Sequence, residues 1–300
     1  MDSRSRISSG AANAAPSVAN NTWKTTRVAT RAVTTEPVAQ RIWRRFTPAQ
    51  RLARFTVYLL VGAAIAAAIR TVEIIPEFLT DAPEQVADLL TRMWPVDIAY
   101  YPTDVHAALT ETLHIASLGT LLALVMAIPV GLLAARNICP FTSLNLFAKL
   151  ILVSSRSINS LVWALLFVGI FGPGALAGTL AIAFRSIGFV GKLFGEAIEE
   201  TARGPIEALD AAGAPWLSRL AFGHWPQVKP AFWSIALFRW DINVRESAVL
   251  GLVGAGGIGM ILDSALNLFQ WTRVATILLA IFVVVILAEI VVTFVRRRIL

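Results

Sequence analysis

The sequence has few of the residues that build metal sites or disulfides. Its 300 residues include one cysteine and three histidines. The single cysteine, Cys139, excludes an internal disulfide and a cysteine-based zinc site. The histidines are scattered and lack the spacing of metal ligands: His106, His114 and His224. We therefore expect no metal ion, no bound cofactor and no catalytic residue on this chain.

Charged residues are also scarce. They make up 15% of the chain, whereas a soluble domain carries about 25%. Hydrophobic residues reach 56%, and the mean hydropathy is +0.68. This composition is typical of a polytopic membrane protein, and it argues against a soluble domain with a large core.

The hydrophobic residues are concentrated in long runs, as membrane helices of about 20 residues require. The clearest run, 274–295, has no polar face and ends in three arginines at 296–298. Further candidate spans are 55–69, 113–135, two within 141–195, and 232–252. The sequence therefore predicts an all-α protein with about six transmembrane helices.

Charge along the chain predicts the orientation. Arginines dominate residues 1–54 and the C-terminal tail, whereas the segment 70–107 between the first two spans is acidic. Basic flanks stay in the cytoplasm, so both termini should be cytoplasmic and the number of spans even. Residues 1–50 are predicted to be a disordered, basic cytoplasmic arm, leaving 51–300 as the transmembrane domain. The arm has the composition of a transit peptide but too few aromatic residues to suggest nucleic-acid binding.

A polar segment at about 196–230 separates the fourth and fifth spans. Pro205 suits the first turn of a helix, and Gly213 suits a left-handed helix end. A second short helix is expected to begin near Pro215. Glu207 and Asp210 are expected near the start of the first helix, where negative charge is favourable. The alternative is an ordinary amphipathic loop.

This segment resembles the "EAA" loop of permeases in ATP-binding-cassette (ABC) importers, which has the form Glu-Ala-Ala, three residues, Gly, nine residues, Ile, one residue, Leu-Pro. The positions in register are Glu207, Ala208, Gly213 and Pro226. The departures are Leu209 for the second Ala, Gly223 for Ile and Trp225 for Leu. The resemblance implies coupling helices that dock on a separate ATPase dimer, which would bind ATP and Mg²⁺. The coupling residues it implies are Glu207, Ala208, Asp210, Ala211, Gly213 and Pro226.

Other segments over about 105–300 are similar to phosphonate-transporter permeases. They are Leu-Val-Trp-Ala-Leu-Leu-Phe at 161–167, Gly-Phe-Val-Gly-Lys-Leu-Phe at 188–194, Glu-Ala-Ile-Glu at 196–199, Asn-Val-Arg-Glu-Ser at 243–247 and the glycine-rich stretch 250–259. At 156–159 the chain has Arg-Ser-Ile-Asn, where relatives often have Arg-Ser-Ile-Pro.

The resemblance implies a type I ABC importer permease in a bacterial plasma membrane. Two copies would form the pore, and an external binding protein would deliver a phosphonate, phosphite or phosphate-like oxyanion. The same machine for another solute, such as methionine, is one alternative. A secondary transporter working alone is another, although the inverted repeats that would favour it are not seen.

The sequence predicts no nucleotide site on this chain. Residues 254–259 fit G-x-G-x-x-G, but they follow a membrane span, and position 279 is Leu instead of an acidic residue. We interpret them as a flexible, closely packed turn. No G-x-x-x-x-G-K-[ST] occurs, so ATP is expected to bind on another subunit.

The fifth span is polar at its centre. Arg239, Asn243 and Glu246 share one helical face, and Asp241 and Arg245 share the opposite face. A charge at mid-bilayer costs about 2.5–3.5 kcal/mol, so these groups should pair with one another or line a cavity, or both. The predicted pathway residues are Arg156, Asn159, Asn243, Arg245 and Ser247. Arg156 and Arg185 interrupt apolar stretches and are candidate sources of positive charge. Arg185 and Lys192 are instead expected to be anchors at the lipid interface if they lie near the cytoplasmic face.

Overall fold

The computed structural model describes residues 46–72 and 76–299, and within these ranges it contains helices and no strand. The prediction of an all-α protein is confirmed. The chain divides into two units, residues 1–74 and 75–300. In chain order the second unit contains α2 (Pro76–Met93), η1 (Tyr101–Val105), α3 (His106–Ala134), α4 (Thr142–Ser157), α5 (Ser160–Phe171), α6 (Ala175–Glu199), α7 (Arg203–Ala211), α8 (Trp216–Ser218), η2 (Arg219–His224), α9 (Trp225–Leu250), η3 (Gly251–Val253), α10 (Ile258–Asn267) and α11 (Trp271–Ile299).

In the first unit, α1 (Pro48–Thr71) begins with a capping box. The side chain of Thr47 accepts from the backbone N–H of Gln50, and the side chain of Gln50 accepts from the backbone N–H of Thr47. The helix therefore begins inside the arm predicted for residues 1–50. Residues 1–45 of that arm lie outside the described residues.

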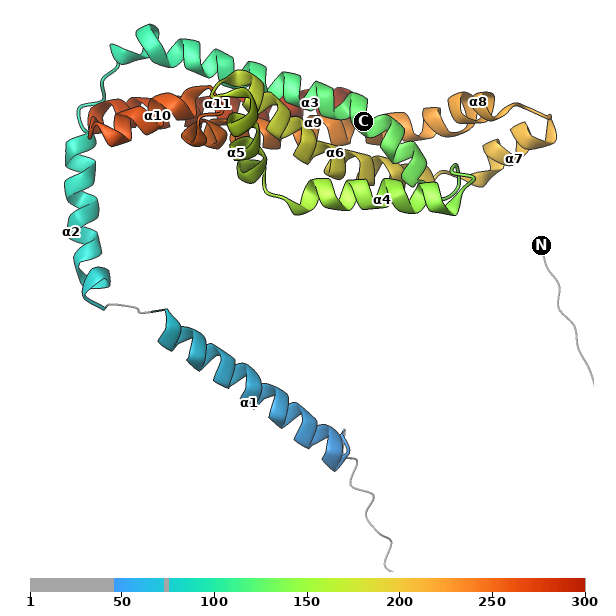
Figure 1. Ribbon diagram of the computed structural model, residues 1–300, viewed down its shortest axis with the longest axis horizontal. Helices are drawn as coiled ribbons and strands as arrows, with labels where there is room; N and C mark the ends of the chain where they lie inside the picture. The colour runs from blue at the N-terminus through green and yellow to red at the C-terminus, as the bar shows by residue number, and fades with distance from the viewer. Residues whose placement is uncertain (1–45, 73–75, 300) are drawn as a thin grey trace, which may run out of the picture. The chain divides into compact units, whose positions relative to one another are not determined.

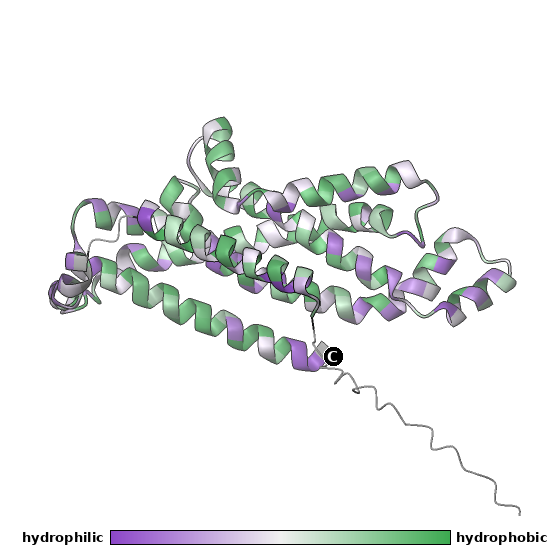
Figure 2. Cartoon of the chain, turned by 90° about the horizontal axis from the view of Figure 1, so that it is seen from below, coloured by the Kyte–Doolittle hydropathy of each residue, from purple (hydrophilic) through white to green (hydrophobic). Residues whose placement is uncertain are grey.

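Four of the described helices are long and apolar enough to cross a membrane: α1, the joined η1 and α3, α6 and α11. Two bent helix pairs meet the same criterion, so the described part of the chain has up to six spans. Figure 2 shows hydrophobic residues running along most of the length of the bundle helices. The observed spans agree with the predicted number of about six.

One of the bent pairs joins α4 and α5 at an angle of 90°. Asn159 lies at this break, where the resemblance to phosphonate-transporter permeases led us to expect a proline. Its backbone is extended, and its side-chain oxygen accepts from the N–H of Leu161 at 3.2 Å. An N-cap therefore replaces the proline as the reason for the break.

Helix α6 is the centre of the bundle and packs against α3, α4, α5 and α9. Small residues make this possible, as in many membrane proteins. A Cβ on Gly188 would lie 2.4 Å from the carbonyl oxygen of Leu152 on α4, and one on Gly119 would lie 2.8 Å from Ile182. These contacts fix the distance between the helices.

The glycine-rich turn between α9 and α10 also packs closely. Gly254, Gly256 and Gly257 have positive φ angles, which glycine adopts without strain. The turn is held by the N–H of Ile258, which donates to Oγ1 of Thr112 on α3 at 2.8 Å. The interpretation of this motif as a packed turn is confirmed.

Candidate functional site

Helices α7, α8 and η2 form a helical hairpin, residues 203–224, at one end of the bundle (Figure 1). The hairpin turns at Gly213, whose φ is +72°. Its N–H donates to the carbonyl of Asp210 at 2.9 Å, and the N–H of Ala214 donates to that of Leu209 at 3.0 Å. This pattern is a Schellman motif. Pro215 then caps the second helix, so the predicted helix–turn–helix is confirmed.

The expected place of the acidic residues is wrong. Helix α7 has no acidic residue in its first turn, and Asp210 lies in its last turn. There its carboxylate accepts from Nη1 of Arg219 on η2 at 2.6 Å. Asp210 therefore joins the two arms of the hairpin and does not interact with the start of α7. The sequence contains a signal for this pair, because Arg219 follows Asp210 by nine residues across the predicted turn.

The base of the hairpin is tied together by two side chains that sequence reasoning missed. Oε1 of Gln227 accepts from the N–H of Ala202 at 2.9 Å, and its Nε2 donates to the carbonyl of Gly223 at 2.7 Å. Nδ1 of His224 lies 2.9 Å from Oγ1 of Thr201. These contacts link the segment before α7 to the start of α9, so the hairpin should move with both α6 and α9.

Two of the three departures from the EAA pattern, Leu209 and Gly223, lie against each other. A Cβ on the buried Gly223 would lie 3.3 Å from Cδ1 of Leu209 and 3.3 Å from Cγ1 of Ile206. A larger residue on α7 thus faces a smaller one on η2. Relative to the EAA pattern, position 209 has gained side-chain volume and position 223 has lost it. The contact between the two arms of the hairpin is kept.

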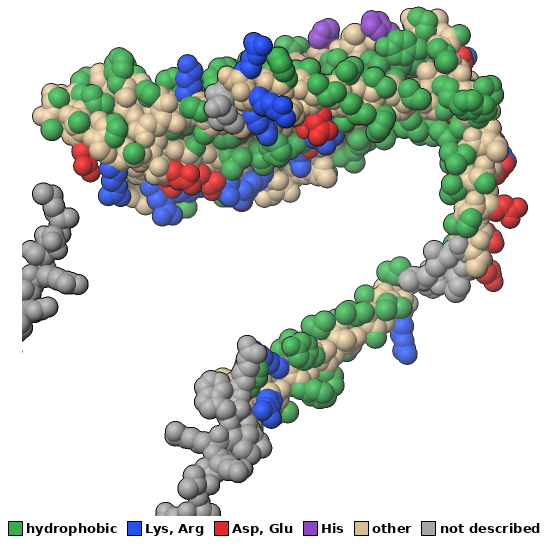
Figure 3. Space-filling view, turned by 180° about the vertical axis from the view of Figure 1, so that it is seen from behind, with side chains coloured by type: hydrophobic (Ala, Val, Ile, Leu, Met, Phe, Trp, Pro, Cys, Tyr) green, Lys and Arg blue, Asp and Glu red, His purple; other side chains and the backbone are tan. Residues whose placement is uncertain are grey.

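The outer face of the hairpin is open. Neither α7 nor α8 contains a buried residue. Exposed on the hairpin are Glu207, Ala208, Ala211, Trp216, Leu217 and Phe222. Small residues beside large exposed apolar ones are typical of a surface that another protein covers. Figure 3 shows basic and acidic side chains gathered towards this end of the bundle.

Inside the bundle, the charges of α9 are paired as the sequence predicted. Nη2 of Arg239 lies 3.2 Å from Oε2 of Glu246, and Arg245 pairs with Asp241. Arg185 on α6 is paired as well, because its guanidinium contacts Glu246 of α9; its place relative to the lipid interface stays a prediction. The partners lie 61 residues apart, so helix periodicity gave no signal. The available signal was that few carboxylates lie within the spans, which leaves Glu246 as a candidate partner for Arg185.

Two predicted pathway residues lie inside the bundle. Asn243 has no exposed surface; its Nδ2 donates to Oγ1 of Thr120 at 2.7 Å, and its Oδ1 accepts from Oγ of Ser186 at 3.3 Å. Ser247 is 1% exposed and donates to the carbonyl of Val244 at 2.9 Å. Asn243 therefore joins α9 to α3 and α6, whereas the hydrogen bond of Ser247 stays within α9.

The other three predicted pathway residues are exposed. Arg156 and Asn159 lie at the break between α4 and α5, and Arg245 lies on α9. The structure does not collect all five in one of the cavities found among the described residues. Within the same residues, no group of three metal-ligating side chains occurs.

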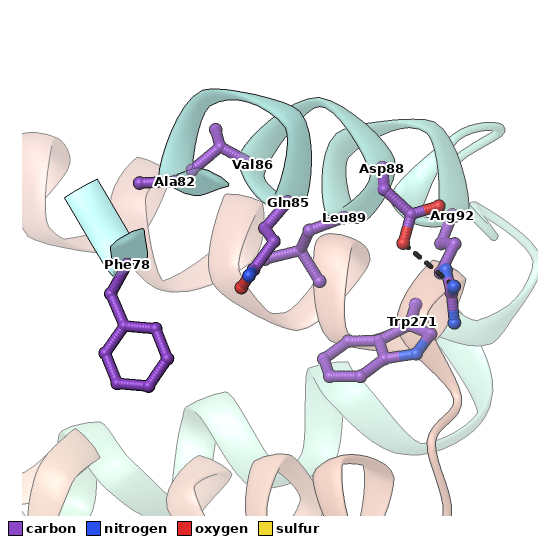
Figure 4. Close-up of a pocket in the computed structure, with 8 residues that line it drawn as sticks. All are labelled: Phe78, Ala82, Gln85, Val86, Asp88, Leu89, Arg92 and Trp271. Atoms are coloured by element: carbon purple, nitrogen blue, oxygen red, sulfur yellow. Dashed lines mark ion pairs between the residues drawn. The ribbon is translucent and has the colours of Figure 1, made fainter. Parts of the chain in front are cut away.

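A pocket of about 680 Å³ lies between α2 and the start of α11 (Figure 4). It is lined by Phe78, Ala82, Gln85, Val86, Asp88, Leu89, Arg92 and Trp271. Its one ion pair joins Asp88 and Arg92 at 2.8 Å. None of the predicted site residues contributes to it. A smaller cavity of about 340 Å³ lies beside the hairpin and is partly lined by Asp210, Trp216 and Arg219.

Comparison with known proteins places these features in a family. Residues 127–300 match the family model "Binding-protein-dependent transport system inner membrane component". The chain is 38% identical over 76% of its length to "Phosphate-import permease protein PhnE" from Mycolicibacterium smegmatis, of which the match spans 43%. It is 40% identical over 68% of its length to "Phosphite transport system permease protein PtxC" from Stutzerimonas stutzeri, of which the match spans 74%.

A solved structure of the "MetNI methionine ABC transporter" in inward-facing conformations is similar in fold. The TM-score is 0.56 at 23% identity, covering 65% of this chain and 96% of that one. The hairpin in register with the EAA loop, the multi-pass helical fold and the family match over 127–300 agree with one another. The chain therefore belongs to the family of inner membrane components of binding-protein-dependent transport systems.

Proposed function

We propose that this chain is the transmembrane permease subunit of an ATP-driven importer for a phosphonate, phosphite or phosphate-like oxyanion. The observation that carries the proposal is the hairpin 203–224, an exposed, Schellman-capped element in register with the coupling motif. The relatives named for phosphate and phosphite supply the substrate class. Methionine import is the alternative within the same family.

The proposed complex contains two copies of this chain, a dimer of ATPase subunits that bind ATP and Mg²⁺, and an external binding protein. Each hairpin docks on an ATPase subunit through Glu207, Ala208, Asp210, Ala211 and Gly213, with Pro226 at the start of the following helix. When ATP closes the ATPase dimer, the hairpins move. Because His224 and Gln227 tie the hairpin to the segment after α6, this motion reaches both α6 and α9.

The pathway between the two copies is proposed to involve Arg156, Asn159 and Arg245 as exposed polar groups. Asn243 and Ser247 support it from inside the bundle. Both termini face the cytoplasm of a bacterial cell, because arginines flank the first and last spans. Reporter fusions after Leu300 and within 80–100 should therefore report opposite compartments.

The test is uptake into proteoliposomes that contain the chain, the ATPase subunit and the binding protein of the same importer. ATP-dependent uptake of labelled phosphate, phosphite or a phosphonate is expected, with no uptake when the ATPase cannot hydrolyse ATP. The purified chain alone should hydrolyse no ATP. Uptake of methionine instead would support the alternative, and solute movement without the ATPase would favour a secondary transporter.

A further inference from the structure

The charged cluster around Glu246 contains more positive than negative charge. One carboxylate oxygen of Glu246 pairs with Nη1 of Arg185, and the other lies 3.2 Å from Nη2 of Arg239. Asp241, the other carboxylate on α9 nearby, is already paired with Arg245. Two guanidinium groups therefore share one carboxylate, and one formal positive charge remains.

The side chains of Arg185 and Arg239 differ in how deeply they are buried and how firmly they are held. The side chain of Arg239 is 4% exposed, and its Nε donates to Oγ of Ser186 at 2.8 Å, so it is fixed inside the bundle. The side chain of Arg185 is 28% exposed. Within the described part of the chain, the buried Nε of Arg185 has no hydrogen-bond partner. Arg185 is therefore the arginine of the cluster whose side chain reaches the surface.

The depth of Arg185 limits what its surface can face. It lies near the middle of α6, a helix that spans Ala175–Glu199. Facing lipid tails there with an uncompensated charge costs about 2.5–3.5 kcal/mol. This face of α6 and α9 is therefore a wall of a polar path or is covered by protein.

The break between α4 and α5 brings a further arginine to this level. Gly188, three residues from Arg185 on α6, packs so closely on α4 that a Cβ there would lie 2.9 Å from the backbone nitrogen of Arg156. The N–H of Gly188 also donates to Oγ of Ser155 at 3.0 Å. Arg156 is exposed. Broken helices supply polar groups at this depth in other transporters as well.

We propose that Arg185 is the residue on this chain that contacts a phosphate-like oxyanion as it crosses the membrane, with Arg156 beside it and Arg239 behind it. This inference rests on the proposed function. A guanidinium binds such an anion through charge-assisted hydrogen bonds. Glu246 competes with the anion for Arg185. Arg239 also pairs with Glu246, which weakens that competition. The contact is therefore weak, as a path that must release its solute requires.

The test uses the full complex with its ATPase and binding protein in proteoliposomes, and labelled phosphate, phosphite and a phosphonate as probes. Arg185→Gln should lower the import rate about tenfold or more, while the binding protein still stimulates ATP hydrolysis. Arg185→Lys keeps the charge and should restore part of the rate. The matched control is Lys192→Gln on the same helix, which removes a lysine paired one to one with Glu196 at 3.3 Å. Its rate should stay within about twofold of the wild type.

If Arg185→Gln imports at the wild-type rate, the anion contact is refuted. Should that variant fail to assemble, Arg185→Gln with Glu246→Gln removes the carboxylate together with its partner, and the same loss is expected. Normal import by the assembled double variant also refutes the contact. A wild-type complex that imports none of the three anions contradicts the proposed function instead, so the two failures are distinguishable.

Discussion

The hairpin 203–224 and the polar interior around Glu246 use charge in different ways. The ion pair of the hairpin, between Asp210 and Arg219, is partly exposed and joins the two arms of the hairpin. The interior joins α6 and α9 through Arg185, Arg239 and Glu246, with Arg239 almost fully buried. An exposed pair contributes about 0–1 kcal/mol, whereas breaking a buried one costs about 3–5 kcal/mol. Changes in the hairpin should thus impair coupling while the fold persists, and the loss of a buried charge partner in the interior should cost more stability.

The largest expected effect lies inside the bundle. Gly188→Val should destabilise the folded protein by about 3 kcal/mol, because the new side chain meets backbone atoms of α4 that cannot move aside. The yield of monodisperse protein in detergent and its thermal unfolding measure this. Gly169→Val is the matched control, since a Cβ at Gly169 meets no atom within 4 Å. Equal stability of the two variants would remove the argument for close packing of α6 on α4.

The next effect tests the exchanged volumes in the hairpin. Gly223→Ile should cost about 1–2 kcal/mol, because its side chain must enter the space that Leu209 and Ile206 occupy. Adding Leu209→Ala should recover much of the loss, since it returns both positions to the volumes of the EAA pattern. Stability and ATP-dependent import are measured for the single and double variants. Two additive losses would show that the positions do not compensate each other.

A smaller effect on stability is expected at the tip of the hairpin. Gly213→Val should strain the turn by about 1 kcal/mol, because φ is +72° there. Import should fall while insertion and yield are maintained. Gly204→Val is the control on the same hairpin, since Gly204 has no positive φ and no neighbour within 4 Å. If both variants import equally well, the shape of the turn does not matter for coupling.

The smallest effect belongs to one hydrogen bond in the interior. Asn243→Ala combined with Thr120→Ala in a double-mutant cycle should give a coupling energy of about 0.6 kcal/mol, the average for such bonds within membranes. Unfolding in mixed detergent measures it. A coupling energy near zero would mean that Asn243 is free to serve the pathway instead of joining α9 to α3.

Much of the hairpin could be predicted because its signals are local. Pro205 lies in the first turn of α7, Gly213 ends that helix and Pro215 precedes the next one, and these residues act over a few positions. The pairing of Arg239 with Glu246 was also predictable, because helix periodicity puts both on one face of α9. The pairing of Arg185 with Glu246 could not be predicted, because it depends on how α6 packs against α9.

Two further differences from expectation have similar causes. Asp210 was expected near the start of α7, but the helix begins at Arg203 and ends one residue after Asp210, so its partner is Arg219 across the turn. Asn159 shows the reverse case: the proline that would signal a break is missing, yet an N-cap produces the same break.

The central claim is that the hairpin docks on an ATPase subunit, and a spin label measures this directly. In a Cys139→Ser background, a label at Ala208→Cys reports on the exposed face of α7, and one at Glu84→Cys reports on α2. Adding the ATPase subunit should immobilise the label at 208 and leave the label at 84 unaffected. Adding ATP afterwards should change the spectrum of the label at 208 further. Equal mobility at 208 with and without the ATPase would contradict the account.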